Sequence, residues 1–253
     1  MLGAIIGDIV GSPYEFANTK NPRFPLFSKR SSFTDDTICT VAVADAILRG
    51  SDFGDTLREW CLRYPNPMGS YGGSFNAWLH SHNPQPYNSW GNGAAMRVAA
   101  VGWAFDTDAE TLRAALASAA PTHNHVEGLI GASTVALAIH KLRIDSWEHV
   151  APIFESAYGI NPALPAPGVF DETCHGCVPL AYKICNESTS FEDAIRRAVL
   201  YGGDSDTLGA IVGSLAEARW GIPAAIKEKA LSMLTEEMLA VINEFSKRYK
   251  YEI

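Results

Sequence analysis

The sequence lacks both a cluster of basic residues and an apolar run of the roughly 20 residues that a membrane-spanning helix needs. No more than two Lys or Arg residues are adjacent among its 253 residues, and the formal net charge is -8 with a pI near 5.3. We therefore expect no electrostatic binding to nucleic acid, although a flipped-out modified base would not require a basic face. The opening MLGAIIGDIVGS has no basic leader and is interrupted by Asp8, so we expect neither a signal peptide nor membrane association.

Cysteine is also scarce, which argues against a disulfide framework. The five cysteines are Cys39, Cys61, Cys174, Cys177 and Cys185. An odd number of cysteines in a chain of this size favours reduced thiols and a cytoplasmic location. The segment TCHGC contains a C-x-x-C with His175 inside it, but no fourth ligand or second pair is evident, so a structural zinc is not favoured.

Strand-like alternation is almost absent, whereas helical periodicity recurs along the chain. Helices are predicted over 36–49, 54–63, 94–104, 108–119, 126–142, 146–158, 191–200, 206–220 and 223–245. Several segments, such as GLIGASTVALAIH, are apolar nearly all round, which is typical of tightly packed inner helices. With 47% hydrophobic residues, the chain can bury roughly three quarters of its unfolded surface. We predict one all-α domain over residues 1–253, and a monomer.

Three irregular stretches interrupt this pattern, over 15–33, 64–97 and 158–176. The second holds an unusual density of Gly, Asn, Pro and aromatic residues. Because irregular segments on a rigid scaffold commonly carry binding and catalytic residues, we expect the functional site among them.

Two short segments concentrate carboxylates and hydroxyls directly before apolar helical runs. They are Thr34, Asp35, Asp36 and Thr37 in FTDDT, and Asp204, Ser205, Asp206 and Thr207 in GGDSDT. If the two helix starts converge, about four negative charges lie together, which requires protonation or bound cations. Oxygen ligands favour Mg²⁺ or Mn²⁺ over zinc, and aspartates at a cap can face two ions about 3.5–4 Å apart. The spacing therefore favours a two-metal site.

Helix capping is the alternative for both segments. Short oxygen side chains accept the unpaired amide hydrogens of a first turn, and Asp204 or Ser205 could do so at the helix that begins near Asp206. One cap needs only one oxygen, but convergence in space is not visible in a sequence. Both interpretations stay open at this point.

Several segments, in their order along the chain, resemble the ADP-ribosylglycohydrolase family. They are GAIIGDIVGSPYEF, FTDDT, SWGNGAAMRV, THNHVEGLIGA and GGDSDTLGAIVGSLAEARWG. The resemblance covers nearly the whole chain, and the paired TDDT and GGDSDT are its most specific part. It implies an all-α, compact orthogonal helical bundle, two Mg²⁺ or Mn²⁺ ions in a cleft, and hydrolysis of the bond between ribose C1″ and an acceptor atom.

The resemblance also implies roles for individual residues. The metal ligands it implies are Glu15, Thr34, Asp35, Asp36, Asp204, Asp206 and Thr207. The substrate-binding residues it implies are Ser89, Trp90, Gly91, Asn92 and Gly93 at the diphosphate and distal ribose, and His123. Without the resemblance, Glu15 would be interpreted as a solvated loop residue, and the G-x-G of residues 91–93 as an ordinary turn. A helix starting near Ala94 would present its positive end to phosphate. We expect His125 to be structural or solvent-facing.

The implied activity is removal of ADP-ribose from an arginine- or serine-linked protein, with a nucleic-acid base or a small molecule as further possible acceptors. Asp35 or Asp36 would orient the attacking water, and Glu15 would swing away to admit substrate; Asp35, Asp36 and Glu15 are thus the expected catalytic residues. The aromatic candidates for stacking on adenine are Tyr71, Phe75, Tyr87 and Trp90. The alternatives are a non-catalytic ADP-ribose-binding or structural relative, and a two-metal phosphoester hydrolase. His175 and Cys177 depart from similar short sequences and bear on acceptor preference.

Overall fold

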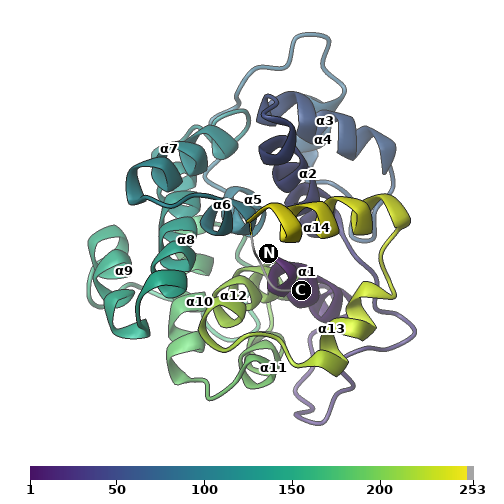
Figure 1. Ribbon diagram of the computed structural model, residues 1–253. Helices are drawn as coiled ribbons and strands as arrows, with labels where there is room; N and C mark the ends of the chain where they lie inside the picture. Colours follow the sequence, from purple (N-terminus) through teal and green to yellow (C-terminus); the bar gives the residue numbers. More distant parts are fainter. Residues whose placement is uncertain (250–253) are drawn as a thin grey trace.

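The computed structural model describes residues 1–249, and helices make up its framework (Figure 1). Within that part the only β-type pairing is two isolated bridges, Thr34 with Met68 and Gly91 with Thr173, so the all-α prediction is confirmed. The helices are α1 (Leu2–Gly11), η1 (Ser12–Tyr14), α2 (Asp35–Arg49), α3 (Phe53–Arg63), α4 (Gly73–Leu79), α5 (Gly93–Met96), α6 (Ala99–Ala104), α7 (Asp108–Ala119), α8 (Val126–Ile144), η2 (Trp147–His149), α9 (Ala151–Tyr158), α10 (Cys174–Glu187), α11 (Phe191–Tyr201), α12 (Ser205–Trp220), α13 (Ala224–Leu231) and α14 (Glu236–Tyr249).

The centre of the molecule is the pair α1 and α12, which pack against each other more extensively than any other two described helices (Figure 1). Every residue of α1 is buried. A Cβ added at Gly7 would lie 1.9 Å from the Gly209 carbonyl oxygen, and one at Gly3 would lie 2.1 Å from that of Gly213. Glycine is therefore required on both helices, because the two backbones are in direct contact. This close packing sets the N-terminal end of α12 beside the C-terminal end of α1.

Two predicted helices are divided in the structure. The segment 94–104 forms α5 and α6, which are separated at Arg97 and Val98. The segment 223–245 forms α13 and α14, because Thr235 starts a new helix by accepting the amide hydrogens of Met238 at its hydroxyl and Leu239 at its carbonyl. Local capping thus overrides a continuous helical pattern.

Three α-helices lie outside the predicted ranges, and the first of them is α1. The short α4 falls inside the second irregular stretch, and α10 begins at Cys174, within the third. Thr173 caps α10 by accepting a hydrogen bond from the Gly176 amide at 3.0 Å. Pro179 lies inside α10, where proline normally disfavours a helix, but it is buried in the core along with most of that face.

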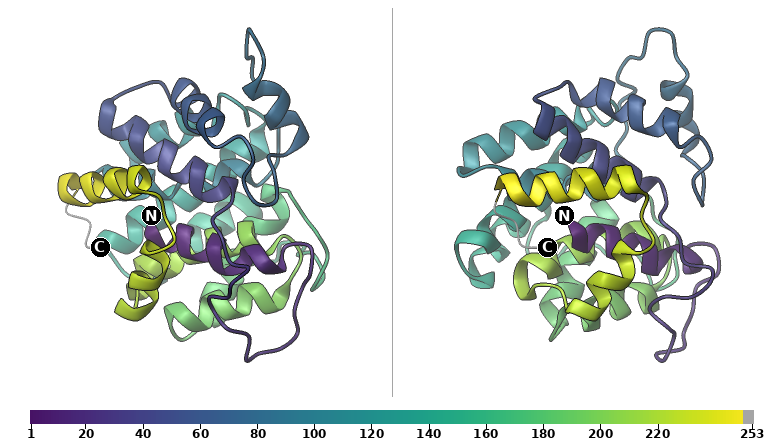
Figure 2. Two further views of the ribbon diagram at one scale, coloured as in Figure 1. Left: turned by 90° about the vertical axis from the view of Figure 1, so that its right-hand side faces the viewer. Right: turned by 45° about the vertical axis from the view of Figure 1, so that its right-hand side comes forward.

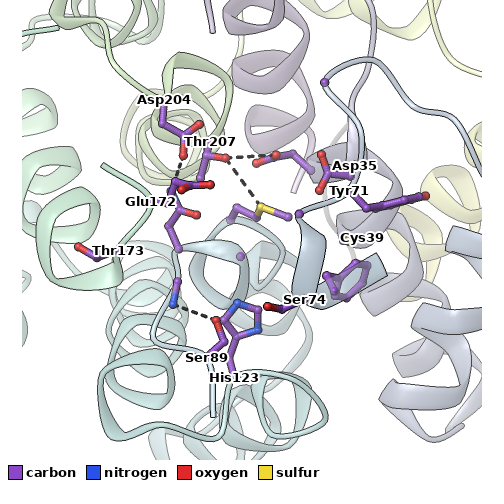
Figure 3. Close-up of a pocket in the computed structure, with 18 of the residues that line it drawn as sticks. Asp35, Cys39, Tyr71, Ser74, Ser89, His123, Glu172, Thr173, Asp204 and Thr207 are labelled. Atoms are coloured by element: carbon purple, nitrogen blue, oxygen red, sulfur yellow. Dashed lines mark hydrogen bonds between the residues drawn. The ribbon is translucent and has the colours of Figure 1, made fainter. Parts of the chain in front are cut away.

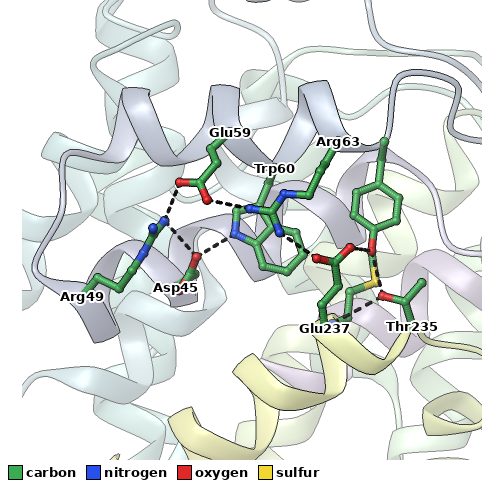
Figure 4. Close-up of polar contacts among 9 residues, drawn as sticks. Asp45, Arg49, Glu59, Trp60, Arg63, Thr235 and Glu237 are labelled. Carbon is green, nitrogen blue, oxygen red and sulfur yellow. Dashed lines mark hydrogen bonds and ion pairs between the residues drawn. The ribbon is translucent and has the colours of Figure 1, made fainter.

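A polar cluster fastens α2, α3 and α14 together on one side of the molecule (Figure 4). The Trp60 indole donates to Asp45 at 2.7 Å, and Arg49 pairs with both Asp45 and Glu59. Arg63 pairs with Glu237 of α14 at 2.7 Å. These partners explain why Asp45, a charged residue, is found in the otherwise apolar part of α2.

The loops between α1 and α2 and between α4 and α5 extend beyond the helical body in both views of Figure 2. Among the described residues, no helix is both long and apolar enough to cross a membrane. The single domain over 1–253 and the monomeric state stay predictions.

Candidate metal and nucleotide site

A cavity of about 870 Å³ opens where the two carboxylate-rich helix starts meet (Figure 3). Its volume lies within the range of nucleotide and cofactor sites. Its lining comes from Glu15 and Phe16, Asp35, Asp36 and Cys39 of α2, residues 69–75, residues 87–93, Met96, Arg97, His123, residues 170–173, and Asp204, Asp206 and Thr207. The three irregular stretches thus surround one cavity.

The first carboxylate group is the start of α2. Thr34 is the N-cap residue, and its hydroxyl oxygen accepts a hydrogen bond from the Asp36 amide at 3.2 Å. Asp35 and Asp36 occupy the first turn, where carboxylates are favoured by the helix dipole. Asp36 is buried and Asp35 is partly exposed to the cavity.

Asp8 of α1 organises this turn, a role that the sequence analysis missed. Its fully buried carboxylate accepts from the Thr34 amide at 3.0 Å and the Thr34 hydroxyl at 2.8 Å. It also accepts from the Thr37 amide at 3.1 Å and the Thr37 hydroxyl at 2.5 Å. The Thr34 hydroxyl donates its proton to Asp8 and accepts from the Asp36 amide, which leaves one lone pair of its oxygen available. A lone carboxylate within an otherwise apolar helix was the signal in the sequence.

The second group is the start of α12. Gly202 and Gly203 have positive φ values of 80° and 83°, which favour glycine. These two residues turn the chain into α12. Asn18 holds this turn, because its side chain accepts from the Gly203 amide at 2.8 Å and donates to the Gly203 carbonyl at 3.1 Å. Asp204 is the N-cap residue but makes no side-chain capping hydrogen bond. The prediction that the Asp204 side chain caps α12 is therefore wrong. The Ser205 side chain does not cap the helix either, because its hydroxyl donates to the Gly203 carbonyl.

The two groups converge. The Thr207 hydroxyl donates to Asp36 Oδ2 at 3.3 Å across the cavity (Figure 3). Carboxylate oxygens of Glu15, Asp204 and Asp206 lie within 4.8 Å of one another. Glu15 ends the short helix η1, and its carboxylate lies against Gly69, 2.8 Å from where a Cβ would be. Five of the predicted carboxylates, Glu15, Asp35, Asp36, Asp204 and Asp206, therefore line one cavity.

Their crowding and burial make ionisation costly. Burial, followed by the negative charge of Asp8, raises the pKa of Asp35 to about 8. Burial and the charge of Asp204 raise the pKa of Glu15 to about 7. For the same reasons the pKa values of Asp36 and Asp206 lie well above the ordinary value.

This donor set fits a hard divalent cation. Asp36 Oδ1 and Asp206 Oδ1 are buried and have no hydrogen-bond partner, and such orphaned acceptors are rare in proteins. All the candidate ligands are carboxylate or hydroxyl oxygens, the set that Mg²⁺ and Mn²⁺ prefer. Positive charge placed here would restore the ionised carboxylates and pair both free oxygens.

The loop 89–93 borders the other end of the cavity. The Gly91 amide donates to Ser89 Oγ at 3.1 Å, and the Asn92 amide donates to the Glu172 carbonyl at 2.7 Å. These two hydrogen bonds fix the shape of the loop. Gly93 and Ala94 are the first residues of α5, so their N–H groups have no acceptor within that helix. The expected long helix after this loop is a single turn, so its dipole is smaller than predicted. The Asn92 side chain donates to Asp204 at 2.7 Å and links the loop to α12.

His123 lines the cavity beside this loop, as expected, and is 6% exposed. Its Nδ1 lies 2.7 Å from the Thr122 hydroxyl, and Thr122 in turn accepts from the buried Arg97. His125 is structural, because its ring accepts from the Glu127 amide and caps α8. The four aromatic candidates, Tyr71, Phe75, Tyr87 and Trp90, all line the cavity.

In the segment TCHGC both cysteine thiols donate hydrogen bonds to backbone carbonyls. Cys174 Sγ donates to the Gly91 carbonyl at 3.1 Å, and Cys177 Sγ donates to the Asp171 carbonyl at 3.0 Å. His175 is exposed and packs against the Tyr158 ring. Within residues 1–249, the acidic cluster at Glu15 is the one group of three metal-ligating side chains. Further cavity residues missed from the sequence are Phe16, Cys39, Phe170 and Glu172.

Comparison with known proteins gives a consistent result. The family model for ADP-ribosylglycohydrolase matches residues 1–252. ADP-ribosylhydrolase ARH3 of Mus musculus is 29% identical over 173 residues, which cover 55% of this chain and 47% of that protein; the Homo sapiens protein of that name is also 29% identical. The match thus spans about half the length of these relatives. A solved structure, an ADP-ribosylglycohydrolase-related protein complex, is 25% identical with a TM-score of 0.76 and covers 98% of this chain and 95% of its own. Sequence and fold together place this chain in the ADP-ribosylglycohydrolase family.

Proposed function

We propose that this protein is a metal-dependent hydrolase that cleaves the glycosidic bond between ADP-ribose C1″ and an acceptor. The observation that carries the proposal is the convergence of two helix starts on one cavity, where Thr207 donates to Asp36 and four further predicted carboxylates line the same cavity. Such a cluster favours bound cations over an unloaded site. An arginine- or serine-linked protein is the substrate that we place first.

The residues that would hold two Mg²⁺ or Mn²⁺ ions are Glu15, Thr34, Asp35, Asp36, Asp204, Asp206 and Thr207. When bound, such ions would coordinate the ribose hydroxyls and lower the pKa of water. The protein's own part is to fix the ligand oxygens, and Asp8 and Asn18 support this by holding the two turns in place.

Asp35 is the better placed of the two aspartates to orient the attacking water. Asp36 is buried and its Oδ2 accepts from Thr207, which leaves it less free to turn toward a substrate. Asp35 is partly exposed to the cavity. A carboxylate in this position suits the removal of a proton from water as it attacks an oxocarbenium-like ribose.

The remaining residues would bind the nucleotide. Ser89 and His123 lie on the side of the cavity away from Asp35 and Asp204 (Figure 3), and together with the rest of the loop 89–93 they suit a diphosphate and its distal ribose. Tyr71 and Phe75 line the same cavity and are candidates to stack on adenine. Glu15 lies at the end of a short helix beside the exposed Phe16, a position from which it could move to admit substrate.

The test is release of ADP-ribose from arginine-, serine- and nucleic-acid-linked conjugates, with Mg²⁺, with Mn²⁺ and with chelator. The proposal predicts release that requires metal and is lost in an Asp35→Ala/Asp36→Ala variant. Binding of ADP-ribose without release from any conjugate would instead support a non-catalytic relative. AMP or phosphate as the product would support phosphoester hydrolysis.

A further inference from the structure

Three residues outside the carboxylate cluster form a hydrogen-bond relay that ends at the cavity. Arg97 is 1% exposed, and its Nη2 donates to the Ser118 carbonyl at 3.0 Å and to the Thr122 hydroxyl at 2.8 Å. The same Thr122 hydroxyl lies 2.7 Å from His123 Nδ1. The relay therefore runs from a buried guanidinium, through one hydroxyl, to the imidazole.

The direction of the second hydrogen bond follows from the first. Arginine has only donors, so Thr122 Oγ1 must accept from Arg97, and its single proton is left to be donated. If Nδ1 carried a proton, the fully buried Thr122 hydroxyl would lose the acceptor that His123 provides. A buried donor without an acceptor is costly, so the hydroxyl donates and Nδ1 accepts.

The opposite nitrogen faces the cavity. His123 Nε2 lies beside the loop 89–93, 3.6 Å from where a Cβ on Gly91 would be and 3.0 Å from where one on Gly93 would be. A neutral imidazole whose Nδ1 accepts must carry its proton on Nε2. We infer that Arg97 and Thr122 lock His123 as the neutral Nε2–H tautomer, so that the histidine presents a fixed, uncharged N–H donor to an acceptor oxygen of the bound ligand.

The groups around the ring support a neutral imidazole. Burial, and then the positive charge of Arg97, lower the pKa of His123 well below its ordinary value. The Tyr87 ring lies 6.2 Å away, and burial raises the pKa of its phenol to about 12, so it is uncharged at neutral pH. Protonation of Nδ1 would also leave the Thr122 hydroxyl proton without the acceptor that His123 provides. His123 is therefore neither a general base nor a charged phosphate anchor.

For the ligand, this inference rests on the proposed function and adds one detail to it. A fixed N–H donor selects an oxygen that can accept at this point, such as a diphosphate oxygen or the ribose ring oxygen of ADP-ribose. Arg97 and Thr122 act through His123 and are positioning residues. Their effect is on the tautomer, which can be measured without any turnover.

The experiment is long-range ¹H–¹⁵N NMR of the full chain labelled at histidine, with the His123 signals assigned from a His123→Gln variant. The expected wild-type pattern is Nε2–H with an unprotonated Nδ1, unchanged between about pH 5.5 and pH 8. Thr122→Val should give mixed tautomers of a neutral ring, whereas Thr122→Ser should restore the wild-type pattern. Thr111→Val is the matched control, because Thr111 on α7 is buried with a hydroxyl that has no partner.

ADP-ribose added to the wild-type protein should shift the Nε2–H resonance, and Thr122→Val should weaken ADP-ribose binding about tenfold. A wild-type ring protonated on Nδ1, or one that titrates near pH 6.5, would overturn the inference even if Thr122→Val failed to fold. Binding of ADP-ribose that leaves the Nε2–H resonance unmoved would overturn the donor role. No binding of ADP-ribose at all would contradict the proposed function, while the tautomer would still be assigned by the wild-type spectrum.

Discussion

Thr207 Oγ1 and Asp36 Oδ2 lie 3.3 Å apart, although 171 positions separate them in the sequence. The contact joins the first turns of α12 and α2, and it exists because the glycines of α1 let α12 approach to backbone contact. Packing at the centre of the molecule therefore determines the geometry of the carboxylate cluster. Changes at either place are expected to affect the other.

Asp8→Asn should weaken metal binding without removing any proposed ligand. The amide would place a donor against the hydroxyls and amides of Thr34 and Thr37, which now all donate to Asp8. We expect the free energy of unfolding to fall by about 2 kcal/mol and the affinity for Mn²⁺ to fall about 10- to 100-fold. Calorimetric titration with Mn²⁺ and urea unfolding measure the two effects.

Asp45→Asn is the control for Asp8→Asn, because Asp45 also accepts hydrogen bonds but lies at the contact of α2 with α3 (Figure 4). It should lower stability with unchanged affinity for Mn²⁺. Equal losses of metal affinity in both variants would show that Asp8 acts only through general stability.

The metal-free protein should become less stable as pH rises. Asp35 and Glu15 have folded-state pKa values of about 8 and 7, above their ordinary values of 3.8 and 4.5. Groups with raised pKa values contribute stability that is fully present below the unfolded pKa and is lost as pH rises through the folded pKa. In chelator, Tm should therefore decline between about pH 4 and pH 8.

Divalent metal should reverse this trend, because it binds the ionised carboxylates and releases protons. At a concentration 100 times Kd it adds about 2.7 kcal/mol, so the rise in Tm should be larger at pH 8 than at pH 5. Thermal unfolding with and without Mn²⁺ checks this, with Asp35→Asn/Asp36→Asn as the variant that should lose most of the dependence. A metal-free Tm that rises steadily up to pH 8 would contradict the crowding argument.

Gly7→Ala should be strongly destabilising despite the better helix propensity of alanine. The new Cβ would lie 1.9 Å from the Gly209 carbonyl oxygen, so α1 and α12 would have to separate. We expect a loss of about 3 kcal/mol or more in the free energy of unfolding. Gly73→Ala in α4 is the matched control, because nothing lies within 4 Å of its Cβ position, and it should gain up to about 1 kcal/mol. Denaturant unfolding gives the free energy of unfolding of both variants. Similar values for the two would argue against direct backbone contact between α1 and α12.

Much of the fold could be predicted from periodicity, and the misses have physical causes. The predicted helices 108–119 and 191–200 correspond closely to α7 and α11, which both begin after a capping hydroxyl, that of Thr107 or Ser190. The segment 94–104 is apolar apart from Arg97 and its pattern predicts one helix, but the helix is interrupted at the buried Arg97, which donates to Ser118 and Thr122. A tertiary hydrogen bond of this kind leaves no mark on local periodicity.

The candidate site divides in the same way. Clustering of aspartate and threonine identified four aspartates and Thr207 that line one cavity, whereas Thr34 lies behind its lining; the roles of all these residues stay predictions. The part played by Asp8 depends on where α1 lies relative to α2, and that of Asn18 on where the loop after η1 meets Gly203. Neither relation can be inferred from spacing along the chain, since it arises only when the helices pack.

The most direct test of the two-metal centre is to measure Mn²⁺ binding to the purified full chain by calorimetry and by electron paramagnetic resonance. Two helix starts that share one cavity predict about two equivalents of Mn²⁺ per chain and the spectrum of a magnetically coupled pair, with binding lost in an Asp35→Asn/Asp206→Asn variant. Isolated ions of weak affinity, or binding that this variant leaves unchanged, would contradict the claim that the two turns form one metal centre.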